Sequence, residues 1–125
     1  MIKESPFAKK EVFLENESAF AIFDGYPVSP GHSLVVPKIE INSIFKLKEI
    51  DYLNCFRLVF EVKKYLEKKY DCKDFNIGIN NGEIAGQTIE HAHIHVIPRY
   101  KNDIKDPRGG VRNILEDKSG YLWVL

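Results

Sequence analysis

The chain has 125 residues, of which 18 are lysine or arginine and 18 are aspartate or glutamate, so its formal net charge is zero. This length suits one domain, residues 1–125, and the charge balance argues against a basic surface for long nucleic acid. The cysteines, Cys55 and Cys72, form no CxxC pair, and we expect no disulfide framework. No stretch is apolar and long enough to span a membrane, and the N-terminus has no apolar signal core. We therefore expect a cytoplasmic protein without a membrane partner.

The first third of the chain predicts three strands. Residues 11–15 alternate between outward and core-facing side chains, and a two-residue turn connects them to a second strand over 18–24, which predicts a hairpin. Two glycines and two prolines in 25–31 predict a loop. A third strand is expected over 32–36, where Pro37 ends it.

The rest of the chain predicts a long helix between strands. Apolar residues at three-to-four spacing indicate a helix over 50–70. Strands are expected over 75–80 and from His91 to Pro98, followed by an extended segment over 101–112 and a short apolar end at 121–125. This order predicts an α+β fold, a mostly antiparallel sheet with one helix on one face. The other face then carries an active site or is covered by a second copy.

Three of the four histidines, His91, His93 and His95, alternate along the last predicted strand. Alternate side chains of a strand share a face, so the three imidazoles would lie about 7 Å apart along it, opposite Ala92, Ile94 and Val96 in the core. A neutral imidazole can attack phosphorus or carbon directly. The pattern therefore favours nucleophilic catalysis.

A metal site is the alternative that we place second. Imidazole is the commonest metal ligand, and histidines that alternate on a strand can bind zinc. The only ligand-type neighbour of the three histidines is Glu90, which alternation places on the opposite face. We expect no metal at the site.

Residues 91–97 read His-x-His-x-His followed by two apolar residues, with apolar residues also at each x. Together with residues 30–37 and 80–88, this run resembles the histidine triad (HIT) family, and the resemblance covers roughly residues 24–99, leaving 100–125 as a C-terminal tail. The resemblance implies a HIT-like fold in a homodimer. It also implies binding of a nucleoside monophosphate unit and cleavage of the bond on its α-phosphorus.

The resemblance also implies roles for the four histidines. His93 would be the nucleophile and would form a nucleotidyl-histidine intermediate that water hydrolyses. His95 would bond the phosphate oxygens or the leaving group, and the backbone carbonyl of His91 would orient His93. His32 would complete the cluster behind them.

Four further residues match positions that contact the nucleotide in the family. Asp24 would bond the ribose hydroxyls, Asn80 would face the ribose and the α-phosphate, and Gln87 and Thr88 would contact the phosphates. On the residues alone, Asp24 and Asn80 are equally well explained as turn residues, because each stands next to a turn-forming sequence.

The residues after the triad indicate a branch of the family. Pro98-Arg99 is typical of the dinucleoside polyphosphate hydrolases, the fragile-histidine-triad-like branch, and Arg99, Arg108 and Arg112 could meet the additional phosphates. A solvated tail explains these arginines nearly as well. The expected activity is hydrolysis of dinucleoside polyphosphates such as diadenosine tetraphosphate. The alternatives are a nucleoside phosphoramidate or aminoacyl-adenylate hydrolase and a non-catalytic nucleotide-binding module.

The resemblance implies a homodimer but no obligatory cofactor. Positioning and electrostatic stabilisation can carry phosphoryl-type transfer, so magnesium is expected only as a complex with the substrate, and zinc is not expected. The long helix and the neighbouring strand would form the dimer interface. Natural contacts are Tyr52, Phe56 and Phe60, which serve equally well in the core.

Overall fold

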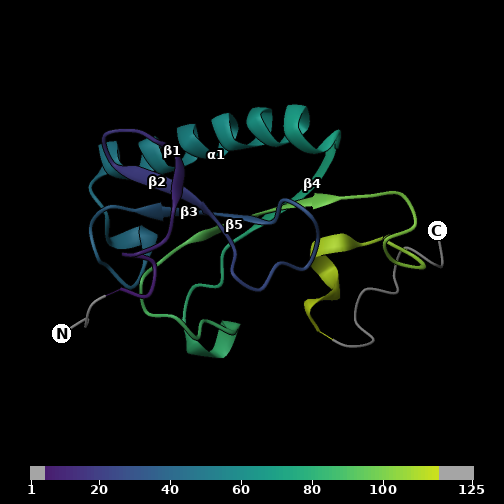
Figure 1. Ribbon diagram of the computed structural model, residues 1–125. Helices are drawn as coiled ribbons and strands as arrows, with labels where there is room; N and C mark the ends of the chain where they lie inside the picture. The colour runs from purple at the N-terminus through teal and green to yellow at the C-terminus, as the bar shows by residue number, and fades with distance from the viewer. Residues whose placement is uncertain (1–4, 116–125) are drawn as a thin grey trace.

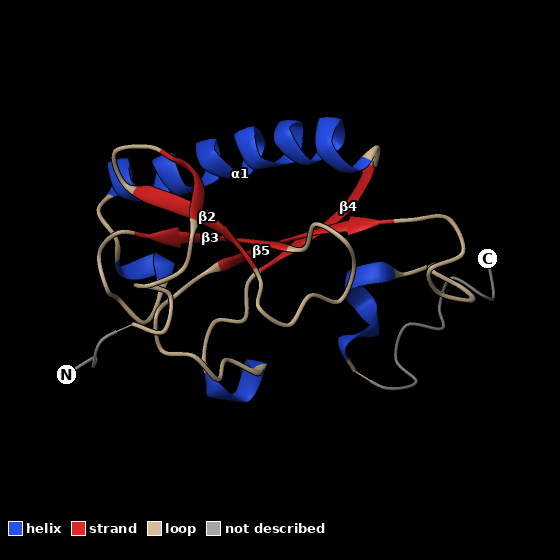
Figure 2. Ribbon diagram, viewed as in Figure 1, coloured by secondary structure: helices blue, strands red, loops and turns tan. Residues whose placement is uncertain are grey.

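The computed structural model describes residues 5–115 and shows a five-stranded sheet with a long helix across one face (Figures 1 and 2). The strand order is β1-β2-β3-β5-β4, and each neighbouring pair is antiparallel. This arrangement confirms the predicted α+β fold. The strands are β1 (Val12–Glu15), β2 (Ala19–Phe23), β3 (Ser33–Pro37), β4 (Asp74–Gly78) and β5 (Ile94–Arg99).

Helix α1 (Glu49–Tyr70) begins one residue before the predicted helix and ends where predicted. Acidic residues in its first turn and Lys68 and Lys69 in its last turn oppose the partial charges of the helix ends. The helix stops at Asp71, which adopts the left-handed conformation with φ 51°. Within residues 5–115, no helix is apolar and long enough to cross a membrane.

The two faces of the sheet are separated by alternation along β3 and β5. Val35, Ile94 and Val96 are fully buried in the core beneath α1. Leu34 and Val36, the two neighbours of Val35 in β3, point to the opposite face. That face has its own small buried cluster, whose members are Phe7, Ile22, Leu34 and Val36.

Three short 3-10 helices were not predicted: η1 (Ile44–Lys46), η2 (Glu83–Ala85) and η3 (Gly110–Ile114). The expectation of an extended segment over 101–112 is wrong, because turns and the start of η3 occupy it. Gly109 and Gly110 have φ of 90° and 42°, and these left-handed conformations turn the chain. The predicted apolar end at 121–125 lies outside the described residues.

The loop before β3 is held close to the end of β5. A Cβ on Gly31, which has φ +88°, would lie 3.0 Å from the ring of Tyr70, so the close approach requires glycine here. The Ser29 hydroxyl donates to the carbonyl of Pro98 at 2.6 Å. These contacts fix the loop that leads into His32.

Candidate active site

Strand β5 presents His95 on the face of the sheet away from α1. Ile94 and Val96 are buried beneath the helix, while His95 pairs across the strands with Leu34 of the opposite cluster. This is the alternation predicted from the histidine run.

The histidine run does not form a single strand, however. β5 begins only at Ile94, because the N–H of Ala92 donates to the carbonyl of Ile41, which belongs to no strand. His91 is 2% exposed, and its ring bonds to groups at the end of β3 and in the N-terminal segment. The expectation of a strand from His91 is therefore wrong at its start: of the three histidines only His95 lies in β5, and His91 and His93 precede it.

His93 is oriented by the backbone of the residue two positions before it. Its Nδ1 lies 2.9 Å from the carbonyl oxygen of His91, as the family resemblance implies. A carbonyl oxygen only accepts, so Nδ1 carries the proton and Nε2 of the neutral ring has a free lone pair. The ring packs edge-on against Phe7 and His95, at centroid distances of 5.2 and 5.0 Å.

A second hydrogen-bonded chain fixes the tautomers of His32 and His95. The N–H of Val28 donates to Nδ1 of His32 at 3.1 Å, so the proton of the neutral ring is on Nε2. That Nε2–H faces Nδ1 of His95 at 2.9 Å and Oδ2 of Asp24 at 3.3 Å. His95 accepts at Nδ1, and its own proton therefore lies on Nε2. The cluster thus offers a lone pair on His93 beside a proton on His95.

Burial keeps the cluster neutral. Removal from water lowers the pKa of His32, His93 and His95 below the ordinary value of 6.5, because it disfavours the charged ring. For His95 the pKa falls to about 4, because the adjacent His93 and His32 lower it in addition to burial. At neutral pH the unprotonated form that nucleophilic attack requires is therefore dominant.

The histidine pocket, a cavity of about 330 Å³, opens beside His93 and His95. This is the lower end of the range for small-molecule sites and suits one nucleotide. Its wall combines apolar and polar side chains. The residues that line it are Pro6, Phe7, Lys10, Ile22, Phe23, Asp24, Gly25, Tyr26, Leu34, Asn80, Gly86, Gln87, Thr88, Ile89, His93 and His95.

The structure brings all four predicted nucleotide contacts, Asp24, Asn80, Gln87 and Thr88, to this pocket. Asp24 has a side chain that is 18% exposed and accepts the N–H of Tyr26 at 2.8 Å. It therefore forms the turn that was the alternative explanation and also lies beside the histidines. Asn80 and Thr88 are exposed residues of the pocket lining.

The side-chain amide of Gln87 is already engaged in the loop that carries it. Its Oε1 accepts the N–H of Gly82 at 2.8 Å, and its Nε2 lies 3.1–3.2 Å from the carbonyl oxygens of Asn42, Ile89 and Glu90. Gln87 thus holds the shape of the loop over residues 82–90. Its side chain has no unused donor to offer a phosphate.

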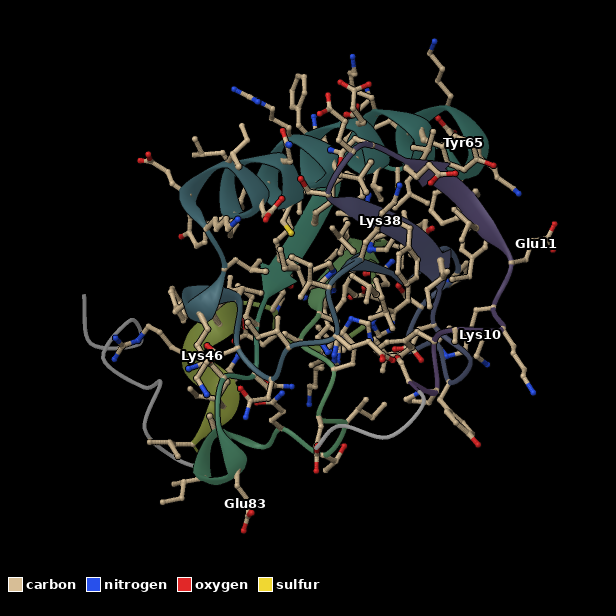
Figure 3. All side chains as sticks on the ribbon, turned by 90° about the vertical axis from the view of Figure 1, so that its left-hand side faces the viewer. Lys10, Glu11, Lys38, Lys46, Tyr65 and Glu83 are labelled. Carbon is tan, nitrogen blue, oxygen red and sulfur yellow. The ribbon has the colours of Figure 1, made fainter. Side chains whose placement is uncertain are left out.

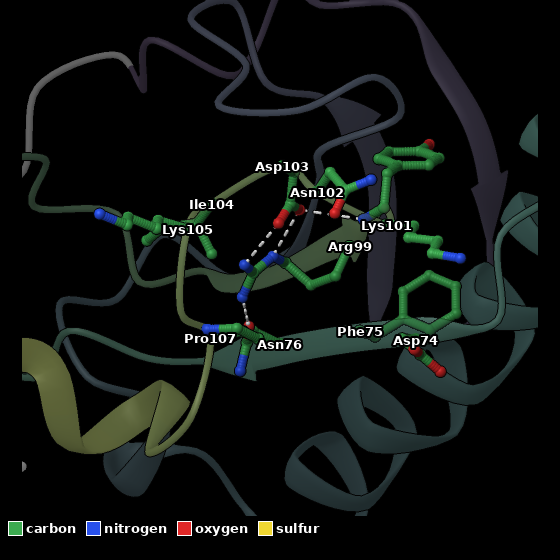
Figure 4. Close-up of a pocket in the computed structure, with 11 residues that line it drawn as sticks. Asp74, Phe75, Asn76, Arg99, Lys101, Asn102, Asp103, Ile104, Lys105 and Pro107 are labelled. Atoms are coloured by element: carbon green, nitrogen blue, oxygen red, sulfur yellow. Dashed lines mark hydrogen bonds and ion pairs between the residues drawn. The ribbon is translucent and has the colours of Figure 1, made fainter.

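The three predicted arginines lie away from the pocket. Arg99 makes two hydrogen bonds of 2.8 Å to Asp103 and one of 2.6 Å to Asn76, and it lines a separate cavity of about 440 Å³ (Figure 4). Arg108 pairs with Asp106, and Arg112 lies in η3; neither lines the histidine pocket. Their expected contact with the substrate phosphates is not supported by this placement.

Sequence reasoning missed the N-terminal side of the pocket. Pro6, Phe7 and Lys10 line it, and Phe7 is only 5% exposed. In Figure 3, the labelled Tyr65 marks α1, and Lys10 lies on the other side of the sheet. No periodicity marks these residues, because the segment is a series of turns.

Lys10 is the only lysine or arginine among the described residues that line the pocket. Its Nζ would lie 3.3 Å from a Cβ on Gly25, next to Asp24. We expect Lys10→Ala to raise KM for an anionic nucleotide substrate about three- to tenfold, since a partly exposed charged contact contributes about 1 kcal/mol. The matched control is Lys9→Ala, which removes the same charge from a residue outside the pocket lining. Equal KM values for the two variants would contradict the expectation.

Asp24, His32 and His95 offer three potential metal-ligand atoms within 4.8 Å of one another. A metal on His32 would need the lone pair of Nε2, which places the proton on Nδ1. A proton on Nδ1 of His32 would face the N–H of Val28, which donates to Nδ1 in this structure. The hydrogen bonding therefore suits a proton better than a cation at this cluster.

The lowered pKa of His95 makes stability depend on pH. Between pH 6.5 and about 4, the unfolded chain protonates this residue while the folded chain does not, so stability falls as pH falls. At 1.36 kcal/mol per pH unit, we expect a loss of about 3 kcal/mol across this window and none above it. Urea unfolding at several pH values measures the slope. His95→Asn should reduce it, and an unchanged slope in that variant would contradict the assignment.

The pocket residues lie within a recognisable family pattern. A HIT domain model matches residues 6–102. The bis(5'-nucleosyl)-tetraphosphatase (asymmetrical) of Schizosaccharomyces pombe is 34% identical over 126 residues, covering 98% of this chain and 69% of that protein. The bis(5'-adenosyl)-triphosphatase of Dictyostelium discoideum is 33% identical over 98 residues, covering 78% and 66% respectively. The chain thus spans about two thirds of the length of these relatives.

A solved structure agrees with these matches. A HIT family protein from Bacillus anthracis is similar with a TM-score of 0.75 at 32% identity, covering 82% of this chain and 78% of that one. The family model extends from the N-terminal wall of the pocket to beyond the last strand. The chain therefore belongs to the histidine triad family of HIT domain proteins.

Proposed function

We propose that the protein hydrolyses dinucleoside polyphosphates at the α-phosphate, through a nucleotidyl intermediate on His93. The observation that carries this proposal is the orientation of His93. Its Nδ1–H is held by the carbonyl of His91 at 2.9 Å, which leaves Nε2 unprotonated in a pocket that also contains His95 and Asp24. The relatives named above are hydrolases of nucleotide phosphoanhydride bonds.

In the first step, Nε2 of His93 attacks the α-phosphorus and forms a P–N bond as the bond to the leaving oxygen breaks. The leaving group departs as a polyphosphate anion, and the Nε2–H of His95 donates a hydrogen bond to its oxygen. The Nε2–H of His32, 2.9 Å from Nδ1 of His95, holds that ring in place. In the second step, water attacks phosphorus and the P–N bond breaks. The water releases its proton to solvent, His93 returns to the neutral Nδ1–H ring, and nucleoside monophosphate is released.

The remaining pocket residues suit the proposed substrate. The cavity of about 330 Å³ accommodates one nucleoside monophosphate, so the rest of a dinucleoside polyphosphate would extend outside it. Asp24 is placed to accept hydrogen bonds from ribose hydroxyls, and Asn80 and Thr88 are placed for the phosphate. Magnesium would arrive only with the polyphosphate.

A phosphoramidate or aminoacyl-adenylate substrate is the second candidate. An amine leaves only after it gains a proton, and His95 holds a proton on Nε2 beside His93. The same two-step scheme then breaks a P–N or mixed anhydride bond of the substrate.

The test is a product assay on diadenosine triphosphate, diadenosine tetraphosphate and an adenosine phosphoramidate, with and without a strong chelator. The proposal is supported if AMP is released faster from the polyphosphates than from the phosphoramidate. In assays without added magnesium, the chelator should leave that rate unchanged. Faster release from the phosphoramidate favours the second candidate. AMP binding without any hydrolysis would favour the non-catalytic module and reject both.

We also propose that two chains associate through α1 and the edge strand β4. Leu53, Phe56 and Phe60 are 42%, 37% and 58% exposed on the helix, and Ile77 is 42% exposed on β4. Such an exposed apolar set is typical of an interface. Light scattering at micromolar concentration should give the mass of a dimer, and Phe60→Lys should shift it toward the monomer. A wild-type monomer would contradict this proposal.

A further inference from the structure

The proposed reaction makes no use of Ser5, although this residue is only 5% exposed and makes several hydrogen bonds. Its N–H donates to Oε1 of Glu40 at 2.8 Å, and its carbonyl accepts the N–H of Ala8 at 3.0 Å. Its hydroxyl accepts the N–H of Phe7 at 3.1 Å and also bonds to Nδ1 of His91. One serine therefore connects the N-terminal side of the pocket to the first histidine of the triad.

The direction of the bond between Ser5 and His91 follows from the other side of the ring. Nε2 of His91 lies 2.7 Å from the carbonyl oxygen of Pro37, which only accepts, so the proton of the neutral ring is on Nε2. Nδ1 is then an acceptor, and the Ser5 hydroxyl donates to it. The imidazole is thus held at both nitrogens, by β3 on one side and by the N-terminal segment on the other.

This held ring belongs to the residue whose carbonyl orients the nucleophile. The carbonyl of His91 accepts Nδ1–H of His93 at 2.9 Å, so any rotation of the His91 backbone moves the partner that selects the His93 tautomer. Phe7, two residues after Ser5, contacts both rings at centroid distances of 5.7 and 5.2 Å. The N-terminal segment therefore supports His93 in two ways: Ser5 bonds to the ring of His91, whose carbonyl orients His93, and Phe7 packs against the ring of His93.

We propose that Ser5 is a positioning residue, which acts through His91 to hold the carbonyl that orients His93 and which seats Phe7 as a wall of the nucleotide pocket. The inference rests on the proposed function insofar as His93 is the nucleophile. Ser5 itself touches no reacting atom. Its contribution is that the lone pair on Nε2 of His93 points into the pocket before substrate arrives.

The kinetic test compares Ser5→Ala with Ser5→Thr and with a matched control, Ser18→Ala. Ser18 is 7% exposed, donates to Asp51 at 2.8 Å and accepts from Asn54 at 2.9 Å, all away from the histidine pocket. We expect Ser5→Ala to lower kcat about tenfold and to raise KM about threefold, because small misplacements of reacting groups are costly. Ser5→Thr keeps the hydroxyl and should recover most of kcat. Ser18→Ala should leave kcat and KM near wild type even where it lowers the melting temperature.

A second readout does not require turnover. Nitrogen-15 NMR of the histidine rings should show His93 as the Nδ1–H tautomer in the wild type and as a mixture in Ser5→Ala. An unchanged tautomer and kcat in Ser5→Ala would overturn the inference, and so would equal losses of kcat in Ser5→Ala and Ser18→Ala. If Ser5→Ala does not fold, Ser5→Cys, a weaker donor, takes its place in the comparison.

The two readouts separate this inference from the proposed function. A wild-type protein that hydrolyses none of the substrates rejects the hydrolase, and the tautomer comparison then decides the role of Ser5 alone. A wild type that turns over normally, with no effect of Ser5→Ala on either readout, rejects the inference and leaves the hydrolase in place.

Discussion

Replacement of His93 by alanine is expected to lower the rate of nucleotide hydrolysis by about four to six orders of magnitude. The reason is that Nε2 of His93 is the one ring nitrogen of the cluster with a lone pair that no described donor occupies. Nδ1 of His95 faces His32, and Nδ1 of His32 faces the N–H of Val28. No neighbouring imidazole can therefore replace it without a change of tautomer.

Initial rates of AMP release measure this loss, and alkaline quenching followed by mass spectrometry of the peptides looks for the intermediate. Wild type should carry one nucleotidyl group on the peptide that contains His93, and His93→Ala should carry none. AMP binding to the variant, measured by calorimetry, provides the control for an intact pocket. Substantial residual turnover in a variant that still binds AMP would exclude His93 as nucleophile.

Replacement of His95 by alanine is expected to affect substrates unequally. Hydrolysis of an adenosine phosphoramidate should fall roughly 10³-fold, because the amine is the poorest leaving group of the series and depends most on the Nε2–H of His95. A nucleotide ester with nitrophenol as leaving group needs no such proton, and its hydrolysis should fall far less. The dinucleoside polyphosphates should lie between the two.

The measurement is kcat on this series of leaving groups for wild type and His95→Ala. A steeper dependence on the leaving-group pKa in the variant identifies His95 as the proton donor. An equal loss on every substrate would mean instead that His95 only stabilises the phosphate oxygens. Lys9→Ala serves as the control in this series as well, since Lys9 is outside the pocket lining.

Much of the fold could be predicted from local patterns. The three-to-four spacing of apolar residues indicates α1, because it reflects the geometry of a helix. It does not identify the buried face of the helix, since Leu53 and Phe60, which follow that spacing, are exposed. The helix is accurate to one residue at its start. The position of His95, opposite to Ile94 and Val96, also follows from alternation alone.

The site could be predicted only in part. The histidine motif and its match to a family identify His32, His93 and His95 as a cluster, and the structure brings them together. The same alternation placed His91 and His93 in the strand, although β5 begins after them, since alternation carries no information about where a strand begins. The start of β5 depends on the hydrogen bond from Ala92 to Ile41, fifty-one residues earlier in the chain.

By itself, the sequence determined the long helix, the approximate positions of the five strands and the chemical character of the site, because these follow from periodicity and residue type. Only the tertiary structure decided that Lys10 and Phe7, rather than Arg99, line the pocket, and that Ser5 holds His91 across 86 positions of the chain. Contacts of this kind join segments whose separation is set by how the whole chain packs. No local pattern encodes them, because each partner alone is an ordinary turn or tail residue.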